Sequence, residues 1–235
     1  MNFVRFLIFF AIAAALLAVV AVPALSSPLL TQMLRDAGVR GGELNASIGV
    51  FDPALFTGRA AQLHIEGRDV TLGPATAGGI DITLHNATFF ERSFEAIQGN
   101  LRDVELTAGG VSVQVARVEI DGPSNAATVA GHFTPDQGEQ IVRQAAERAG
   151  FTLQKVELED GGLRVSIGGL SARAAVGVEG GGLVLRPAIG PTVLLLSPVP
   201  TDPWRLTEAW VSPDGITVRG VIDASVLARR AMAQP

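Results

Sequence analysis

The residue types that most often carry chemistry are few in this chain. The three histidines, His64, His85 and His132, are far apart, and none lies in an H-E-x-x-H or G-x-S-x-G motif. His64 and Glu66 alternate on one face of a predicted strand, but two ligands do not make a metal site. We therefore expect His64 to be an exposed structural residue and His132 to belong to the start of a helix.

The carboxylates give no better case for catalysis. They gather near a predicted hairpin turn and along strands, at Glu157, Glu159, Asp160, Asp103, Glu105, Glu119 and Asp121. Their spacing does not place one carboxyl group as a general acid opposite another as a general base. We therefore expect these residues to be solvated side chains of turns and strand edges. The chain has no G-x-G-x-x-G or G-x-x-x-x-G-K sequence, a single lysine and no cysteine. We predict no enzyme activity, no cofactor and no metal.

The remaining side chains with functional potential are apolar. In the sequence TFFERSFEAI, residues 88–97, Phe90, Phe94 and Ile97 recur at i, i+4 and i+7, the spacing of an amphipathic helical turn. Three roles are open for them: packing in the core, lining a lipid-sized groove, and dipping into a membrane surface.

Composition also favours apolar surface. The 235 residues are 48% hydrophobic and 17% charged, with a net charge of −5. A negative chain has no general attraction to phosphate polymers, so we expect no nucleic-acid partner. The apolar excess has two explanations, which are the codon bias of a high-GC genome and apolar surface that binds something.

An uncharged segment, FLIFFAIAAALLAVVAVPAL, occupies residues 6–25. As a helix it reaches about 30 Å, enough to span a bilayer core. Its small residues Val22, Pro23 and Ala24 also resemble the end of a cleavable signal peptide. Residues 1–27 are therefore a transmembrane anchor or a signal segment, and residues 28–235 an extracytoplasmic domain. We expect a location at the cell membrane, or a secreted or periplasmic one if the segment is cleaved.

The elements predicted for residues 28–235 are mostly strands. Apolar residues alternate with polar or small ones over 63–65, 80–84, 104–106 and 111–120, with a bulge expected near Ala116 and Arg117. Three hairpins are predicted, 151–158 with 163–167, 170–178 with 183–185, and 204–211 with 216–222, and a further strand over 192–196. A helix over 135–149 begins at Thr134 with a T-x-x-Q capping box, and short helices are expected at 29–34 and 224–233.

These nine or ten strands and two or three helices indicate an α+β fold, a long curled antiparallel sheet wrapped around the helix at 135–149. The helix has a narrow, small-residue apolar stripe, so space between it and the sheet would be apolar and suited to acyl chains. The candidates for lining such a groove are Phe90, Phe94, Ile97, Ile141, Ala145, Leu153, Leu163, Val165, Ile167 and Val176. The candidates for contacting a lipid head group are Arg143, Arg148 and Arg186.

The order of elements resembles a known family. An N-terminal apolar segment, then VAGHFTPDQGEQIVRQAAERAG, FTLQKVELEDGGLRVSIG, LVLRPA and WVSPDGITVRGVID resemble the LmeA-like phospholipid-binding family of bacterial envelope proteins, over roughly residues 30–225. The resemblance implies an elongated tubular lipid-binding domain. It also implies phospholipid binding in an apolar groove at the extracytoplasmic membrane face, in support of lipid transport or envelope glycolipid assembly. The alternative is a structural or scaffolding envelope protein without a ligand, whose sheet edges pair with partners.

Overall fold

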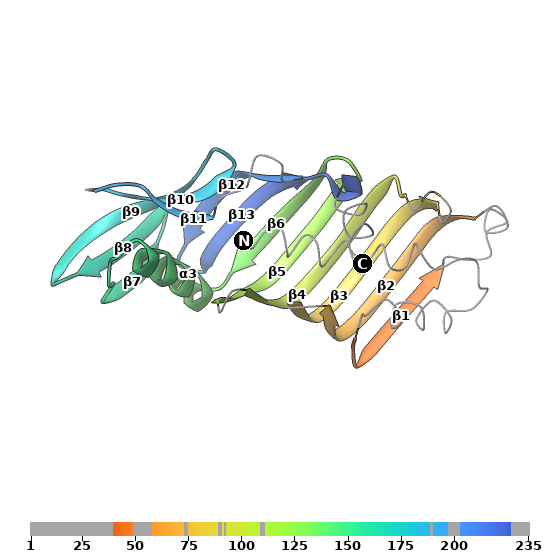
Figure 1. The fold of residues 1–235 in the computed structure, drawn as a ribbon, viewed down its shortest axis with the longest axis horizontal. Helices are drawn as coiled ribbons and strands as arrows, with labels where there is room; N and C mark the ends of the chain where they lie inside the picture. The colour runs from red at the N-terminus through yellow and green to blue at the C-terminus, as the bar shows by residue number, and fades with distance from the viewer. Residues whose placement is uncertain are drawn as a thin grey trace.

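The computed structural model describes residues 40–48, 58–72, 75–88, 91, 93–108, 111–188, 190–196 and 203–226. These residues form one helix, thirteen strands and a short helical turn at 224–226. Figure 1 shows an elongated molecule whose strands lie side by side across its long axis. The predicted helix at 29–34, the segment 6–25 and most of the expected helix at 224–233 lie outside the described residues. Within those that are described, no helix is both long and apolar enough to cross a membrane.

Two antiparallel sheets contain all the strands. The eight-stranded sheet has the order β1-β2-β3-β4-β5-β6-β13-β12 and the five-stranded sheet the order β11-β10-β9-β8-β7. The first consists of β1 (Glu43–Ile48), β2 (Arg59–Leu72), β3 (Ala75–Thr88), β4 (Ala96–Ala108), β5 (Val111–Pro123), β6 (Ala127–Phe133), β12 (Trp204–Ser212) and β13 (Gly215–Ile222). The second consists of β7 (Lys155–Glu159), β8 (Gly162–Ile167), β9 (Leu170–Glu179), β10 (Gly182–Pro187) and β11 (Val193–Leu196).

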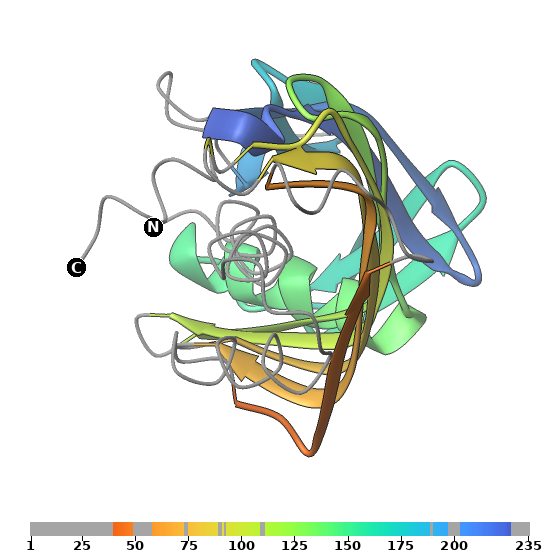
Figure 2. The ribbon, with the colours of Figure 1, turned by 90° about the vertical axis from the view of Figure 1, so that its right-hand side faces the viewer.

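The sheet-dominated fold and the three C-terminal hairpins are therefore confirmed. Thirteen strands exceed the nine or ten expected, because residues 43–108 form four paired strands and the alternation of apolar residues is visible in only short parts of them. Viewed along the long axis, the eight-stranded sheet curls into an arc (Figure 2).

The curl coincides with a line of extra residues across four strands. In β2 and β4, two successive buried residues at this line lie three positions apart instead of the two of a regular strand, Gly67 and Val70 in β2 and Leu101 and Val104 in β4. Buried hydrophobic side chains have the same spacing of three at Ala77 and Ile80 in β3 and at Val115 and Val118 in β5, where the sequence predicts a bulge. Each of the four strands β2 to β5 has one extra residue at this line. The pairing register of neighbouring strands is therefore the same before and after the line. We call this line the crease; it comprises Asp69, Gly78, Asp103 and Ala116.

Backbone conformation explains the residue types at the crease. Asp69 and Asp103 have φ of 49°, in the left-handed region that L-residues rarely adopt. Aspartate and asparagine tolerate this region better than other side chains, and Gly78 lies between the two aspartates in the register. Bulges bend strands and increase their twist, so the crease turns the sheet without breaking its pairing.

Helix α3 (Pro135–Arg148) lies at the junction of the two sheets. Thr134 caps it, with the predicted capping box present. The Gln137 Oε1 atom accepts from the backbone N–H of Thr134 at 3.0 Å and from that of Ala116, in the crease, at 3.1 Å. The helix packs against β7, β11 and β13, and less closely against β5 and β6. A Cβ on Gly138 would lie 3.0 Å from the Ile216 Cδ1 atom, so glycine permits the close approach.

One local prediction is wrong. Phe94 and Ile97 do not lie on a helical turn, because β4 begins at Ala96 and a bridge joins Thr88 to Ser93. Residues between these points connect two antiparallel strands, and such a short apolar run fits a turn followed by a strand as well as a helix. Phe90 lies outside the described residues.

Candidate functional site

The inner face of the eight-stranded sheet is lined by buried apolar side chains. Its fully buried members include Leu63, Ile65, Ile82, Leu84, Leu101 and Ile120. They oppose one another across β2 to β5, for example Leu63 with Leu84 and Ile65 with Ile82. No charged or uncharged polar residue is among the buried residues of the described ranges. The side chains of this face are therefore hydrocarbon, with almost no polar groups among them.

Helix α3 does not extend along this whole face. Its 14 residues measure about 21 Å, whereas eight strands place their outermost members about 34 Å apart. The helix packs on the β5, β6 and β13 part and on the five-stranded sheet. The predicted arrangement, a sheet wrapped around the helix, therefore describes one end of the sheet, and β1 to β4 continue beyond it (Figure 1).

The predicted groove residues fall into two groups. Phe94 and Ile97 are buried at the start of β4, on the eight-stranded sheet. The second group lies where α3 meets the five-stranded sheet, with Ala145, Leu153, Leu163 and Val165 buried and Ile141 and Val176 partly buried against the same apolar cluster. Ile167 lies apart from both groups, because it is 41% exposed at the end of β8.

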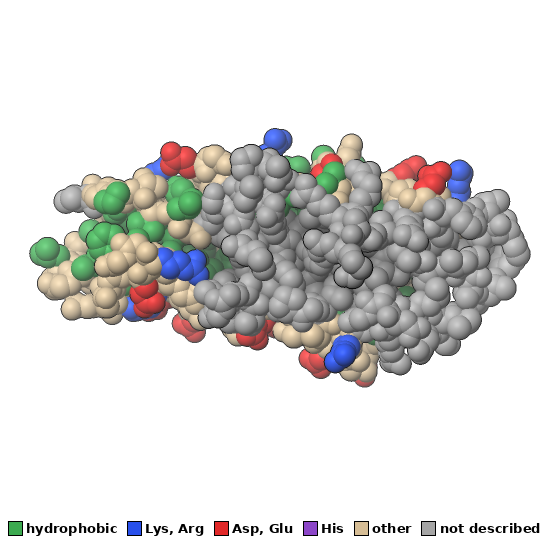
Figure 3. Space-filling view, viewed as in Figure 1, with side chains coloured by type: hydrophobic (Ala, Val, Ile, Leu, Met, Phe, Trp, Pro, Cys, Tyr) green, Lys and Arg blue, Asp and Glu red, His purple; other side chains and the backbone are tan. Residues whose placement is uncertain are grey.

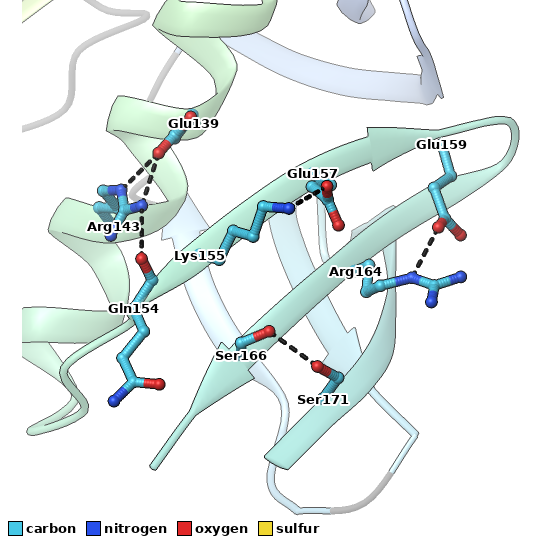
Figure 4. Close-up of polar contacts among 9 residues, drawn as sticks. All are labelled: Glu139, Arg143, Gln154, Lys155, Glu157, Glu159, Arg164, Ser166 and Ser171. Atoms are coloured by element: carbon cyan, nitrogen blue, oxygen red, sulfur yellow. Dashed lines mark hydrogen bonds and ion pairs between the residues drawn. The ribbon is translucent and has the colours of Figure 1, made fainter. Parts of the chain in front are cut away.

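The three arginines predicted to contact a head group are not gathered at one place. Arg143 donates to the carboxylate of Glu139 at 2.7 Å and to the backbone carbonyl of Gln154 at 3.3 Å (Figure 4). It also donates to the backbone carbonyl of Leu153. Its guanidinium therefore holds the helix to the segment that leads into β7. Arg186 pairs with Glu179 at 3.3 Å, and Arg148 is exposed in the last turn of α3. Of these, Arg148 is the one for which no hydrogen bond is recorded in the described part.

One polar group on the inner face was not anticipated from the sequence. Trp204, in the edge strand β12, is 3% exposed and lies opposite Ile222, yet its Nε1 atom has no hydrogen-bond partner. A buried N–H without an acceptor costs about 1 to 3 kcal/mol. The sequence marks Trp204 only as the first residue of a strand, and no local pattern signals an unpartnered donor.

Two titratable residues outside this face, His64 and Glu159, have structural partners. The His64 Nε2 atom lies 2.6 Å from the Glu66 carboxylate and its Nδ1 atom 3.0 Å from the Thr83 hydroxyl. The described residues contain no cluster of three or more groups that could hold a metal ion. Glu159 accepts from Arg164 at 2.7 Å and from Arg173 at 3.2 Å, and these cations, Arg164 first, lower its pKa. The two arginines keep the Glu159 carboxylate ionised and occupy its oxygens, so it is not available as a general base. Its role is to hold the two strands together next to their turn.

Comparison of the chain with protein-family models, curated proteins and solved structures finds no match in any of the three. The resemblance to the LmeA-like family therefore stays a prediction.

Proposed function

We propose that this protein binds phospholipid, with the acyl chains lying against the inner face of the eight-stranded sheet beside α3. The observation that carries the proposal is the extent of that face, which is apolar across β2 to β5 and continues beyond the reach of the only described helix. Each methylene removed from water contributes about 0.8 kcal/mol, so contact along one acyl chain is sufficient for tight binding. The apolar segment at residues 6–25 would hold the domain at the extracytoplasmic face of a membrane.

Trp204 supplies a polar contact suited to such a ligand. The ester carbonyl oxygens of a phospholipid lie between its apolar chains and its head group, and they accept hydrogen bonds. The unpartnered Nε1 donor of Trp204 lies at one edge of the apolar face. An ester oxygen bound there would satisfy a donor that is otherwise buried at a cost.

Photochemical crosslinking in vesicles tests the proposal on the full chain. Phosphatidylcholine with a diazirine in one acyl chain is mixed with the protein, irradiated, and the adducts are mapped by mass spectrometry. We expect adducts on inner-face residues of β2 to β5, in addition to those on residues 6–25. Adducts confined to residues 1–27 would overturn the proposal and leave the scaffolding alternative, in which the sheet is filled by protein alone.

A pair of tryptophan variants makes the test sharper. Trp204→Phe keeps an aromatic ring on the inner face and removes the donor, so the yield of inner-face adducts should fall. Trp210→Phe is the matched control, because Trp210 is 42% exposed and stacks under the Arg219 guanidinium at 5.3 Å. Equal adduct yields in the two variants would show that Trp204 contributes no polar contact to the lipid.

A further inference from the structure

An apolar stripe leads from the buried core to one exposed end of the molecule. In β8, Leu163 and Val165 are 1% and 6% exposed, and Ile167 on the same face is 41% exposed. In β9, Ala174 is 4% exposed, and Leu170 on the same face is 79% exposed. The turn that joins the strands is Gly168–Gly169, so Ile167 and Leu170 are paired neighbours at its base. Figure 3 shows apolar side chains gathered at this end, over the five-stranded sheet. We call residues 167–170 the hairpin tip.

The tip points away from the eight-stranded sheet. At the other end of β8, the Gly161 N–H donates to the backbone carbonyl of Val211 in β12, which holds that turn against the larger sheet. Figure 4 shows the two ends of the hairpin. The Glu159–Arg164 pair lies at the end near the larger sheet, and the Ser166–Ser171 pair lies toward the tip. Beyond the two serines the tip carries no polar side chain.

The polar groups next to the tip already have partners. The hydroxyls of Ser166 and Ser171 lie 2.8 Å apart, and the Gly169 N–H donates to the side-chain oxygen of Gln154 at 3.2 Å. Inserting a turn into hydrocarbon is costly mainly when its backbone N–H and C=O groups lose water without a substitute. A side chain that satisfies the turn's own amide removes part of that cost.

Charge near the tip also fits a lipid surface. The chain has a net charge of −5, yet the segment 161–178 contains no acidic residue and two arginines, Arg164 and Arg173. Phe151, 40% exposed, adds an aromatic ring in the segment three residues before Gln154. Both arginines pair with Glu159 at the far end of the hairpin, and the tip itself carries no carboxylate that phosphate head groups would repel.

We propose that the hairpin tip inserts into the surface of a lipid bilayer. The two residues on each strand beyond the serine pair extend about 6 Å, which matches the depth of about 5 to 10 Å at which interfacial apolar groups are buried. A leucine that is 79% exposed at a hairpin turn can be covered by a fluid medium that surrounds the turn, and lipid supplies one. Because the stripe runs from the tip into the apolar cluster where α3 meets the five-stranded sheet, insertion would also connect the bilayer with the end of the cluster that leads to the proposed lipid-binding face; this last step alone rests on the proposed function.

The absence of cysteine allows a direct test on the full chain. Leu170→Cys and Leu194→Cys are each labelled with an environment-sensitive fluorophore and reconstituted into phosphatidylcholine vesicles that contain phosphatidylglycerol. Leu194 is the matched control, since it is a 56% exposed leucine of the same sheet, in the edge strand β11. Both proteins share the segment at residues 6–25, so any difference reports the position of the label.

We expect a nitroxide on the lipid acyl chains to quench the label at position 170 severalfold more than the label at position 194, and aqueous iodide to do the reverse. Adding Ile167→Ser to the Leu170→Cys protein should reduce the nitroxide quenching severalfold. Equal quenching at both positions would overturn the proposal. A spectral shift at position 170 that depends on protein concentration and not on nitroxide would also overturn it, by assigning the tip to a second copy of the chain. Quenching does not depend on whether adducts form on the inner face, so this test and that of phospholipid binding can fail separately.

Discussion

Gln137 joins the helix to the crease, and removing its side chain should uncouple the two. Its Oε1 atom accepts one hydrogen bond from the Thr134 N–H, inside the capping box, and one from the Ala116 N–H, where β5 carries its extra residue. Gln137→Ala removes the acceptor from both. Ala116 is half-buried, so its N–H regains water only in part.

The expected loss is about 2 kcal/mol in the free energy of unfolding. Each of the two hydrogen bonds contributes about 1 kcal/mol net, and the amide left without a full partner adds to the loss. The better helix propensity of alanine offsets about 0.4 kcal/mol. Thr134→Ala should cost less, about 0.5 to 1 kcal/mol, because the Thr134 Oγ1 atom accepts a long bond of 3.4 Å from the Gln137 N–H.

Urea denaturation of the full chain, followed by tryptophan fluorescence in one fixed detergent, measures these differences. A loss of about 2 kcal/mol lowers the midpoint by about 1 M urea for a protein of this size. Gln137→Glu keeps an acceptor at the same place and should restore most of the stability. Gln140→Ala is the matched control, because Gln140 is exposed on the same helix. If Gln137→Ala and Gln140→Ala unfold at the same urea concentration, the two hydrogen bonds of Gln137 do not contribute to the free energy of unfolding, and the reasoning is refuted.

Three further changes test other parts of the fold. Gly215→Ala should prevent stable folding or cost more than about 3 kcal/mol, because φ is +141° there and a Cβ would lie 2.0 Å from the Phe133 carbonyl oxygen; soluble, folded protein with an unchanged thermal midpoint would contradict this. Asp103→Gly should be tolerated and Asp103→Val should cost about 1 to 2 kcal/mol, since φ is 49°, and equal midpoints would show that the crease is not strained. The pKa of Glu159 is lowered, mainly by Arg164, so its stabilisation is present above about pH 4.5 and is lost as the pH falls through the lower folded-state pKa. Glu159→Gln should therefore lower stability at neutral pH and flatten its decline in acid, as read from unfolding midpoints over pH, and an unchanged acid profile would exclude the ion pair as a source of stability.

The C-terminal half of the fold could be predicted in detail because its signals are local. The capping box at Thr134, the glycine-containing turns and the alternation of apolar residues each act within a few positions, and the helix and three hairpins follow from them. The bulge at Ala116 was also predictable, since a change in the parity of apolar residues is visible within one strand.

The crease as a whole could not be predicted, because it depends on which residues of neighbouring strands are paired, and the sequence of one strand does not show this. Asp69 and Asp103 read as ordinary polar residues in their own strands, and only the pairing places Gly78 between them. The same limit applies to the candidate site. Its apolar residues were expected to face a lipid, but the exposure of Ile167 and the unpartnered Trp204 donor depend on where other elements end.

The alignment of the crease is what allows a bent sheet to keep one apolar face. A single extra residue in one strand would shift its register against both neighbours, and a shift of one residue turns every side chain beyond it to the opposite face. Here Leu101 and Val104 lie on either side of the extra residue in β4 and both are buried, because β3 and β5 carry their own extra residues at the same line. The bend and the unbroken inner face are therefore one property of the sheet. Any ligand that lies along the inner face follows that bend, which favours a flexible apolar chain over a rigid planar molecule.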